Sequence, residues 1–413
     1  MYKTSFHEMK QFEDYDEVEK ILRSEDFASA LHLRDSGPLL LGCVLTLNGE
    51  EHRERRRLVA PLFERGALGH YENTVMMEAL GVALDRAASE AGPDGLPRID
   101  LLWLSRMALV PVTAAMVGLD GVETEERIAH LEDVSRRLGE GASVEWSLRD
   151  HGEVMRDAMA AREEFLEHFY EPSMARRRDL VAGWRAGEIA EEDLPIDLIT
   201  VVLKAHGDDL DEELWRTEAA FFVVASANTT THSVPHIYQE ILTWMGERPD
   251  EALLLTENEV FLQHAVDEAL RLHGVVPALL RRSLKDQETL HGVAVEEGED
   301  LACMLNEASS DPKVYGADSL TFDPHRGETM SRLKAQGMAF GAGAHRCAGR
   351  PMAAGLPPAG SGEITVLGMV PRLVKELLLR GGDVDPADPP ERRTDTEAVR
   401  YARYPIVFTN WTD

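Results

Sequence analysis

Apolar residues recur every three to four positions along most of the chain, which is the spacing of an amphipathic helix. Glycine-rich or polar stretches separate these periodic segments from one another. The segments with helical spacing are Asp16–Leu22, Tyr71–Ala88, Leu101–Val117, Glu153–Gly183, Leu214–Met245 and Val260–Leu272. The pattern therefore predicts a protein built mainly of long helices.

Strand-like runs are short and lie late in the chain. Glu288–Val295 and Asp300–Leu305 flank a Glu-Glu-Gly turn, and they predict a small strand pair. Arg400–Phe408 predicts a further strand. Two acidic stretches that open with glycine are expected to be loops: Gly207–Asp211 and Gly381–Glu391. The fold class expected is mainly α with a small β portion.

Composition narrows the classes of partner. The 413 residues carry a net charge of −31, which argues against nucleic acid and anionic membrane surfaces as main partners. The three cysteines, Cys43, Cys303 and Cys347, have neither disulfide nor zinc spacing, so we expect a reduced, cytoplasmic protein. No apolar leader or run of eighteen apolar residues occurs, and we expect no membrane association.

One cysteine stands in a glycine-rich run near the C-terminus, Phe340–Gly349. Glycine lets the backbone pass close to a flat ligand and adopt positive φ. Free N–H groups in such a loop can point at one sulfur and hold it as a thiolate, and a helix expected from about Ala348 would add its positive end. Cys347 is therefore a candidate ligand or nucleophile, although an isolated cysteine in such a turn is more often simply buried.

This run matches, position by position, the Phe-Gly-x-Gly-x-His-x-Cys-x-Gly haem-ligand loop, and the chain resembles the cytochrome P450 family of soluble bacterial type. The resemblance implies one domain over residues 1–413, with an α-rich lobe and a smaller β lobe. It also implies haem b, iron protoporphyrin IX, with the Cys347 thiolate as the metal ligand. Phe340, which opens the loop, is implied to bind the cofactor.

A second motif lies in the middle of the segment Leu214–Met245. Ala225-Ser-Ala-Asn-Thr-Thr is similar to the family's oxygen-binding helix, where small residues such as Ala225 let the cofactor approach. Thr229 falls on the threonine that hydrogen-bonds the bound dioxygen, with Thr230 next to it. Asn228 replaces the usual acid, and an amide cannot relay protons as a carboxylate does. Proton delivery is then expected through Thr229, Thr230, water or substrate, or it is slow.

Four basic residues match the family's contacts to the haem propionates. His52 and Arg56 stand at i and i+4 of a predicted helix, where they can hold one anion together. Arg281 and His345 match two further contacts, and Arg282 is an adjacent rival for the role of Arg281. Three more arginines form either a solvated face or a patch suited to an acidic ferredoxin: Arg53, Arg55 and Arg57.

Two further motifs are structural. Glu268 and Arg271 stand at i and i+3 on an apolar helix and match the family's Glu-x-x-Arg pair, which braces the core near the haem. Phe322–Arg326 resembles a structural element before the cysteine loop, to which no chemistry is assigned.

The chain departs from the family pattern in two places. The stretch before His52 is short, so the first helix and first strand of the family are expected to be missing. After Cys347, a proline- and glycine-rich insertion around 354–362 interrupts a helix, because such residues cannot continue it. Helical periodicity resumes over Glu363–Leu379.

The function implied is a haem-thiolate monooxygenase that inserts one atom of O2 into an apolar small molecule. Electrons would come from a separate ferredoxin or similar donor, since no strand-linked nucleotide fingerprint is present. The segments expected to face the substrate carry no charged cluster: Pro38–Leu45, Ala225–Thr229 and Val275–Leu280.

Three alternatives remain open from the sequence. A peroxide-driven or non-oxygenating haem-thiolate enzyme would account for Asn228. A haem-binding sensor without turnover would keep the same loop. A hydrolase using Cys347 with His345 is disfavoured, because residues two apart in such a loop rarely align and no orienting carboxylate is evident.

Overall fold

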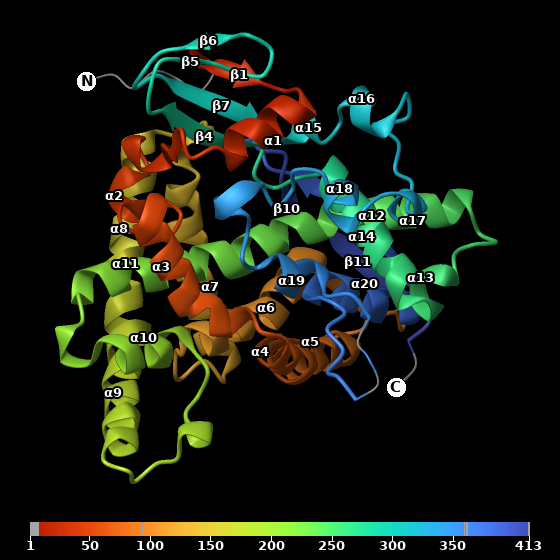
Figure 1. The fold of residues 1–413 in the computed structure, drawn as a ribbon. Coiled ribbons are helices and arrows are strands. Elements are labelled where there is room, and N and C mark those ends of the chain that lie inside the picture. The colour runs from red at the N-terminus through yellow and green to blue at the C-terminus, as the bar shows by residue number, and fades with distance from the viewer. Residues whose placement is uncertain (1–7, 93, 359, 361, 412–413) are drawn as a thin grey trace.

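Long helices form most of the molecule in the computed structural model, which describes residues 8–411 except 93, 359 and 361. Figure 1 shows a small β region at one end, near the N-terminus, and a long helix, α12, that crosses the middle of the helical body. The predicted fold class, mainly α with small sheets, is confirmed.

The helices that frame the body are longer than one turn and bury one face each. They are α1 (Tyr15–Arg23), α3 (Gly49–Val59), α4 (Arg65–His70), α5 (Met77–Ser89), α6 (Leu101–Val117), α7 (Glu125–Ala142), α8 (His151–Phe165), α9 (Glu171–Arg185), α10 (Leu198–His206), α11 (Glu212–Val223), α12 (Thr229–Glu247), α14 (Glu259–Leu272) and α20 (Met369–Leu379). One-turn helices connect them: α2 (Gly37–Leu40), α13 (Leu254–Glu257), α15 (Leu305–Ala308), α16 (Pro312–Tyr315), α17 (Arg326–Thr329), α18 (Arg332–Ala335) and α19 (Arg350–Ala354). Further 3-10 turns are 31–33, 60–63, 144–146, 191–193, 207–209 and 343–345.

Three long helices of the sequence pattern contain a π-helical segment. These segments are Tyr71–Met76 before α5, Leu166–Tyr170 between α8 and α9, and Val224–Asn228 between α11 and α12. A π-helical turn widens a helix locally without ending it. Each predicted segment therefore remains one continuous helix. The segment Val224–Asn228 lies within the second sequence motif.

The hydrophobic core surrounds α6 and α12, which pack against each other. α6 is buried along most of its length, begins at the N-cap Asp100 and ends at Gly118, whose φ of 91° is left-handed. Its observed bounds coincide with the predicted ones. A continuous buried cluster joins it to α11, α12, α14 and α20.

The β portion consists of four small sheets. The largest has the strand order β1-β7-β4-β2, from Lys10–Phe12, Asp300–Met304, Ala278–Ser283 and Phe27–Ser29; β1 and β7 are parallel and the other neighbours antiparallel. A second sheet has the order β3-β11-β8, from Arg98–Asp100, Pro405–Phe408 and Gly382–Val384. Two hairpins complete the set, β5 (Gln287–Glu288) with β6 (Ala294–Val295) and β9 (Glu391–Arg392) with β10 (Tyr401–Arg403).

Several strand predictions are wrong in detail. Glu288–Val295 is not one strand but the β5–β6 hairpin, and β7 pairs with β4 and β1 instead of with that run. Thr289 N–H donates to Val293 O, which turns the chain back early. Arg400–Phe408 splits into β10 and β11 around Tyr404, and Gly381–Glu391 contains β8.

The proline- and glycine-rich insertion leaves α19 only five residues long, and helix α20 begins at Met369 instead of at Glu363. The carboxylate of Glu72 accepts hydrogen bonds from the N–H groups of Leu367 and Gly368, at 3.2 and 2.8 Å, and holds this stretch extended. Gly368 has a φ of 104°, and a Cβ there would lie 2.4 Å from the Gly355 nitrogen. The chain around Gly355 packs closely against the chain around Gly368, so helix α20 begins only after this contact.

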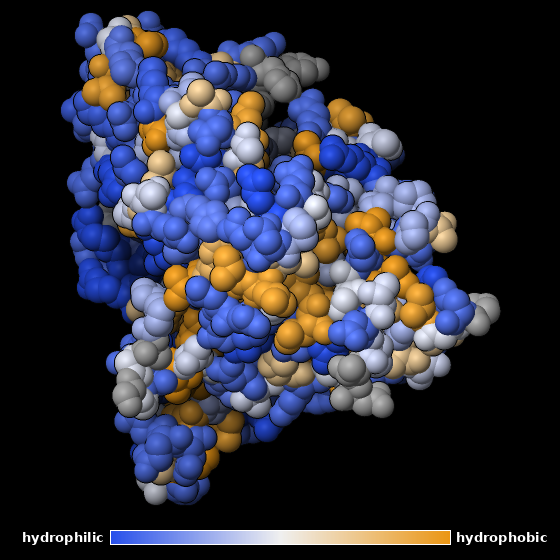
Figure 2. Space-filling view, turned by 90° about the vertical axis from the view of Figure 1, so that its right-hand side faces the viewer, coloured by the Kyte–Doolittle hydropathy of each residue, from blue (hydrophilic) through white to orange (hydrophobic). Residues whose placement is uncertain are grey.

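The insertion and the start of α14 enclose a surface hollow of about 550 Å³. Its walls include Leu356 and Pro357 from the insertion, Val366 from the stretch before α20 and Val260 from α14. Figure 2 shows the side of the molecule that carries α13 and α17, where hydrophobic residues gather in a band between hydrophilic ones. Among the described helices, none has the length and apolar content needed to cross a bilayer.

Candidate functional site

The cysteine loop is held by its own backbone and by α1. The Cys347 N–H donates to Phe340 O at 2.9 Å, so the two ends of the loop meet. Gly341 and Gly343 have φ of 65° and 70°, which side chains disfavour. A Cβ on Gly343 would lie 2.3 Å from Leu22 O at the end of α1. Glycine is required here both for backbone conformation and for close packing.

Cys347 differs from the other two cysteines in its surroundings. Its side chain is exposed, whereas Cys43 and Cys303 are buried. Burial nevertheless raises the pKa of the Cys347 thiol, opposed by hydrogen bonds from Gly349 and Arg350 N–H and by the charge of Arg56. Cys347 is therefore an accessible cysteine whose thiolate is favoured by nearby N–H groups and by Arg56. Burial raises the pKa values of Cys43 and Cys303 to about 12, so these remain thiols.

Basic side chains from three elements converge beside this loop. The rings of His52 from α3 and His345 lie with their centroids 4.0 Å apart and their planes tilted by 31°, and Arg56 donates to Arg346 O at 3.1 Å. Burial, together with Arg56, lowers the pKa of His52 to about 4. Burial and the neighbouring His52 lower the pKa of His345 to about 3. Both imidazoles are therefore neutral at pH 7 and can donate or accept hydrogen bonds.

Arg281 completes this basic cluster and lacks a counter-charge. It is buried in β4, where one nitrogen donates to Leu280 O at 2.9 Å and the other, Nη2, has no partner. The neighbour Arg282 is instead paired with Asp300, at 2.6 and 3.0 Å. No ion pair joins Arg56 or Arg281 to a carboxylate among the described residues. Arg282 is thus already paired with a carboxylate, whereas Arg281 keeps a free buried donor. The geometry favours Arg281 over Arg282 as a propionate contact.

The basic cluster of His52, Arg56, Arg281 and His345 fits the two carboxylates of a porphyrin. Buried charges are stable in proteins when paired, and the orphaned Nη2 of Arg281 is a donor that such a carboxylate satisfies. The exposed sulfur of Cys347 lies in the same loop as His345. The donor set therefore suits haem with a thiolate ligand, as the resemblance implies.

The π-helical segment brings small and hydroxyl side chains together near the middle of the molecule. Ala225 is exposed although it lies on a core helix, and Thr229 Oγ1 donates to Ala225 O at 2.9 Å. Thr230 Oγ1 donates to Ser226 O at 3.2 Å. Thr113 of α6 donates to Ser226 Oγ at 2.9 Å. Ser226 thus holds the segment to α6, a role that the glycine usual at this place does not have.

Asn228 points toward α7. Its amide nitrogen lies 2.6 Å from Ser135 O and 2.9 Å from Ser135 Oγ, and donates to both. A Cβ on Gly139, one turn later in α7, would lie 2.8 Å from the same nitrogen. The residue expected near the reacting oxygen is therefore tied to α7, with its amide proton donors used.

The Glu-x-x-Arg pair is buried, as expected of a brace. Arg271 and Glu268 are exposed by 0% and 1% and form two hydrogen bonds of 2.7 and 2.8 Å. Arg326 adds a third contact to Glu268 at 3.1 Å and also donates to Tyr315 O. Arg271 further donates to Ser309 O and Ser319 O. This cluster ties α14 to the chain that leads into the cysteine loop.

The extra arginines of α3 are largely neutralised. Arg55 pairs with buried Glu218 of α11 at 2.5 Å, and Arg53 and Arg57 both pair with Glu50. They do not form a free basic patch.

Sequence reasoning missed Ser135, Gly139 and Thr113, which hold the π-helical segment from α7 and α6. No motif marks them. Their only signal in the sequence is a small or hydroxyl residue on the buried side of a helix.

These features match one family. The sequence profile described as Cytochrome P450 matches residues 2–354. The chain belongs to the cytochrome P450 family, and the predicted resemblance is confirmed. The matched part includes the cysteine loop, the π-helical segment and the Glu268–Arg271 pair.

Curated relatives of this chain include oxygenases of small molecules. Nocardicin C N-oxygenase from Nocardia uniformis subsp. tsuyamanensis is 26% identical over 318 residues, 76% of this chain and 69% of the relative. Cytochrome P450(MEG) from Priestia megaterium is 26% identical over 306 residues, 73% of this chain and 65% of the relative. Steroid C26-monooxygenase from Mycobacterium tuberculosis is 23% identical over 312 residues, and the match spans 62% of that relative.

Solved structures share the fold at low identity. CalO2 has a TM-score of 0.73 at 20% identity, covering 99% of this chain and 92% of that one. P450BioI, solved with an acyl carrier protein that bears hexadec-9Z-enoic acid, has a TM-score of 0.71 at 19% identity, covering 99% and 95%. These likenesses establish the architecture and leave the substrate open.

Proposed function

We propose that this chain is a haem-thiolate monooxygenase that inserts one atom of O2 into a small organic molecule. The observation that carries the proposal is the accessible Cys347 sulfur beside a basic cluster that has no carboxylate partner among the described residues. Membership of the cytochrome P450 family supports it.

The residues that would hold haem b fall into two groups, those near the iron and the porphyrin ring and those near the propionates. Cys347 would supply the thiolate ligand, and Phe340 and Ala225 would border the ring. His52, Arg56, Arg281 and His345 would hold the two propionates through charge-assisted hydrogen bonds. When bound, haem supplies the oxygen and electron chemistry, since no side chain can activate O2.

The chain's own contribution is to hold hydroxyl protons near the reacting oxygen. Thr229 Oγ1 and Thr230 Oγ1 each bond a carbonyl one turn earlier, at 2.9 and 3.2 Å, so both hydroxyls are held on the π-helical segment. Asn228 cannot relay a proton while its amide serves Ser135. The Thr229 hydroxyl can rotate away from Ala225 O and then serve as the donor, with Thr230 as its neighbour on the helix, and water or substrate resupplies the proton.

Electrons would come from a separate carrier, a ferredoxin or a similar acidic protein. Arg346 and Arg350 flank Cys347 and form no ion pair with any described residue, so they are free to meet acidic side chains.

The cytoplasmic location and the shortened N-terminus stay predictions.

The absorption spectrum tests the proposal. We expect the reduced, carbon-monoxide-bound holoprotein to show the red-shifted Soret band of thiolate ligation. Cys347→Ala should lose this band, whereas Cys303→Ala, at a buried thiol, should retain it. A band at the position typical of histidine ligation in the parent protein rules the proposal out.

One observation favours a peroxide-driven form of the same chemistry: the Asn228 amide donates hydrogen bonds to Ser135 and cannot relay a proton. Hydrogen peroxide delivers oxygen together with its protons, so a proton relay is less needed. Turnover with peroxide alone, compared with turnover on O2 and a reductase, separates the two. Electron uptake without product from either oxidant supports a sensor instead.

A further inference from the structure

Arg400 lies in the segment that contacts the N-terminal half of α12, and its side chain has no partner among the described residues. The Nε of Arg400 is buried without an acceptor, and its side chain makes no hydrogen bond or ion pair with any residue that the structure describes. Arg400 precedes β10, and its backbone oxygen accepts from Arg393 N–H at 2.9 Å. The side chain is nevertheless only partly buried, so its other nitrogens reach an accessible space.

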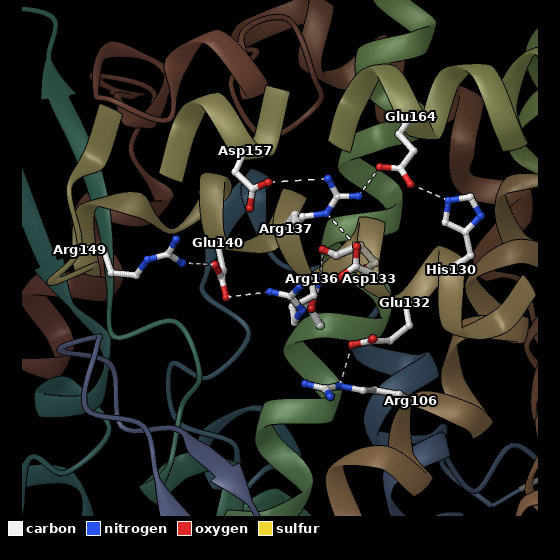
Figure 3. A network of polar contacts seen from close by, with 12 residues as sticks. Arg106, His130, Glu132, Asp133, Arg136, Arg137, Glu140, Arg149, Asp157 and Glu164 are labelled. Carbon is white, nitrogen blue, oxygen red and sulfur yellow. Dashed lines mark hydrogen bonds and ion pairs between the residues drawn. The ribbon is translucent and has the colours of Figure 1, made fainter. Parts of the chain in front are cut away.

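The two carboxylates whose charges act on Arg400, Glu140 and Asp395, are both engaged by other arginines. Glu140 of α7 meets Arg149 at 2.8 Å, Arg393 at 3.3 Å and Arg136 at 3.4 Å. Asp395 is paired with Arg393 at 2.7 Å. Figure 3 shows how densely this polar network ties α7 to its neighbours, with Arg106 on Glu132 and Arg136 between Asp133 and Glu140. Among the described residues, Arg400 is left without a hydrogen-bonded or ion-paired carboxylate of its own.

The surroundings of Arg400 do not remove its charge. Burial, followed by repulsion from Arg393, lowers its pKa to about 10, so the guanidinium remains protonated at neutral pH. Charged groups in low-dielectric surroundings are unfavourable unless paired. A buried cation without a paired carboxylate among the described residues is a candidate site for an anion supplied from outside.

The position of Arg400 relates it to the reaction site. His236 Nε2 donates to Val399 O at 3.0 Å, which sets the segment against α12. Ala225, Thr229, His232 and His236 follow a 4-3-4 spacing, so they share one face of the helix. The rise of an α-helix places His236 about 10 Å along the axis from Thr229. Val399, with 61% of its side chain exposed, and Arg400 thus lie along the face that carries Thr229.

His232 adds a neutral polar group at the same place. Its Nδ1 is buried and has no partner, and Arg400 is the charge that acts on it most strongly. Burial lowers the pKa of His232 far below its usual range, so the ring is uncharged. A neutral imidazole can donate one hydrogen bond to an anion that Arg400 attracts.

Arg400 is separate from the cluster that would hold the propionates. The charges acting on His52 are Arg56, Arg53 and Arg281, and Arg400 is not among them. The same holds for His345. Arg400 therefore serves another anion.

We propose that Arg400 anchors the carboxylate of an organic acid whose apolar body extends along α12 toward Thr229. This deepens the proposed function and rests on it, because it names the substrate class of the same site. A guanidinium matches a carboxylate in two parallel hydrogen bonds, which fixes the direction of the molecule as well as its charge. The proposal adds one cation to the largely apolar site that the sequence segments predict.

Calorimetric titration of the holoprotein tests the assignment with defined probes. Dodecanoate and biphenylcarboxylate are each compared with the alcohol of the same carbon skeleton. We expect at least one acid to bind roughly tenfold or more tightly than its alcohol, the scale of a hydrogen bond between charged groups. Arg400→Gln should abolish that preference and leave the affinity for the alcohol unchanged, and Arg400→Lys should retain part of it.

Arg403→Gln is the matched control, since it removes the same charge three residues away from an exposed pair with Asp388. It should keep the preference for the acid. Equal binding of acid and alcohol by the parent protein, absence of measurable binding by both acids, or a preference that survives Arg400→Gln overturns the proposal. The carbon-monoxide spectrum reports independently on the thiolate, so failure of the proposed function is seen separately.

Discussion

The side-chain nitrogen of Asn228 lies 2.6 Å from the backbone oxygen of Ser135, which makes it a donor to α7. A carboxylate at the same position has no proton to give, and its oxygen would face a carbonyl oxygen. Ser135 therefore offers hydrogen-bond acceptors that suit an asparagine at this position and not the acid that is usual in the family. Asn228 links α7 to the end of the π-helical segment, directly before Thr229 of α12.

We predict that Asn228→Asp destabilises the protein by about 1–3 kcal/mol, because Ser135 O loses its donor and meets a negative charge. Urea unfolding of the parent and the variant measures this. Ser135→Ala is the matched control, since it keeps the backbone oxygen that Asn228 bonds and removes only the hydroxyl, with its long bond to Val223 O, and it should cost less. A gain in product per NADPH in Asn228→Asp, with unchanged stability, would show that an acid relay fits after all.

Arg281→Gln should weaken haem retention, because a buried carboxylate would lose a charge-assisted hydrogen bond. The expected loss is roughly tenfold or more in haem affinity. The adjacent Arg282→Gln is the control, since that side chain is paired with Asp300 and should leave haem affinity unchanged. Transfer of haem to apomyoglobin provides the rate of loss. Equal rates for the two variants contradict the assignment.

Removing one partner of the buried brace should be costly. Arg271→Ala leaves Glu268 short of two hydrogen bonds in the core, and we expect a loss of about 3–5 kcal/mol. Glu19→Gln breaks the exposed i,i+4 pair with Arg23 and should change stability by about 0.5 kcal/mol or less. Denaturant midpoints of both variants test this contrast. If Arg271→Ala is too unstable to purify, Arg271→Lys should show an intermediate loss.

His236 should make stability depend on pH below neutrality. Burial, with the adjacent His273, lowers its pKa from 6.5 to about 4 in the folded state. The unfolded chain therefore binds more protons between these values, so stability falls as the pH drops below 6.5. The contribution of this residue amounts to about 2 kcal/mol of lost stability at pH 5.

His236→Gln keeps a donor for Val399 O and should flatten the pH profile of unfolding between pH 7 and 5. His70→Gln, at an exposed ring, should leave the profile unchanged. An identical slope in parent and His236→Gln excludes this source of acid sensitivity.

Periodicity located the helices well because a buried face must repeat along the helix. The bounds of α6 were obtained in full, and Leu214–Met245 remains continuous through its π turn. Helix α7 was not singled out, because charged residues cover most of its surface and Gly139 and Gly141 weaken its last turn. The partner of β7 was wrong, because a strand's neighbours depend on distant chain segments and not on its own pattern.

The sequence by itself determined the family, the helical class and the identity of the candidate ligand Cys347, because spacing within one loop is local information. Tertiary structure decided which cations are compensated. Arg282 and Arg281 are adjacent, yet one meets Asp300 and the other is buried without an anion. Arg400 carries no motif at all, and its lack of a partner follows only from how α7 and the C-terminal segment use up the neighbouring carboxylates. Pairing of charges is a property of three-dimensional proximity, which the order of residues along the chain does not specify.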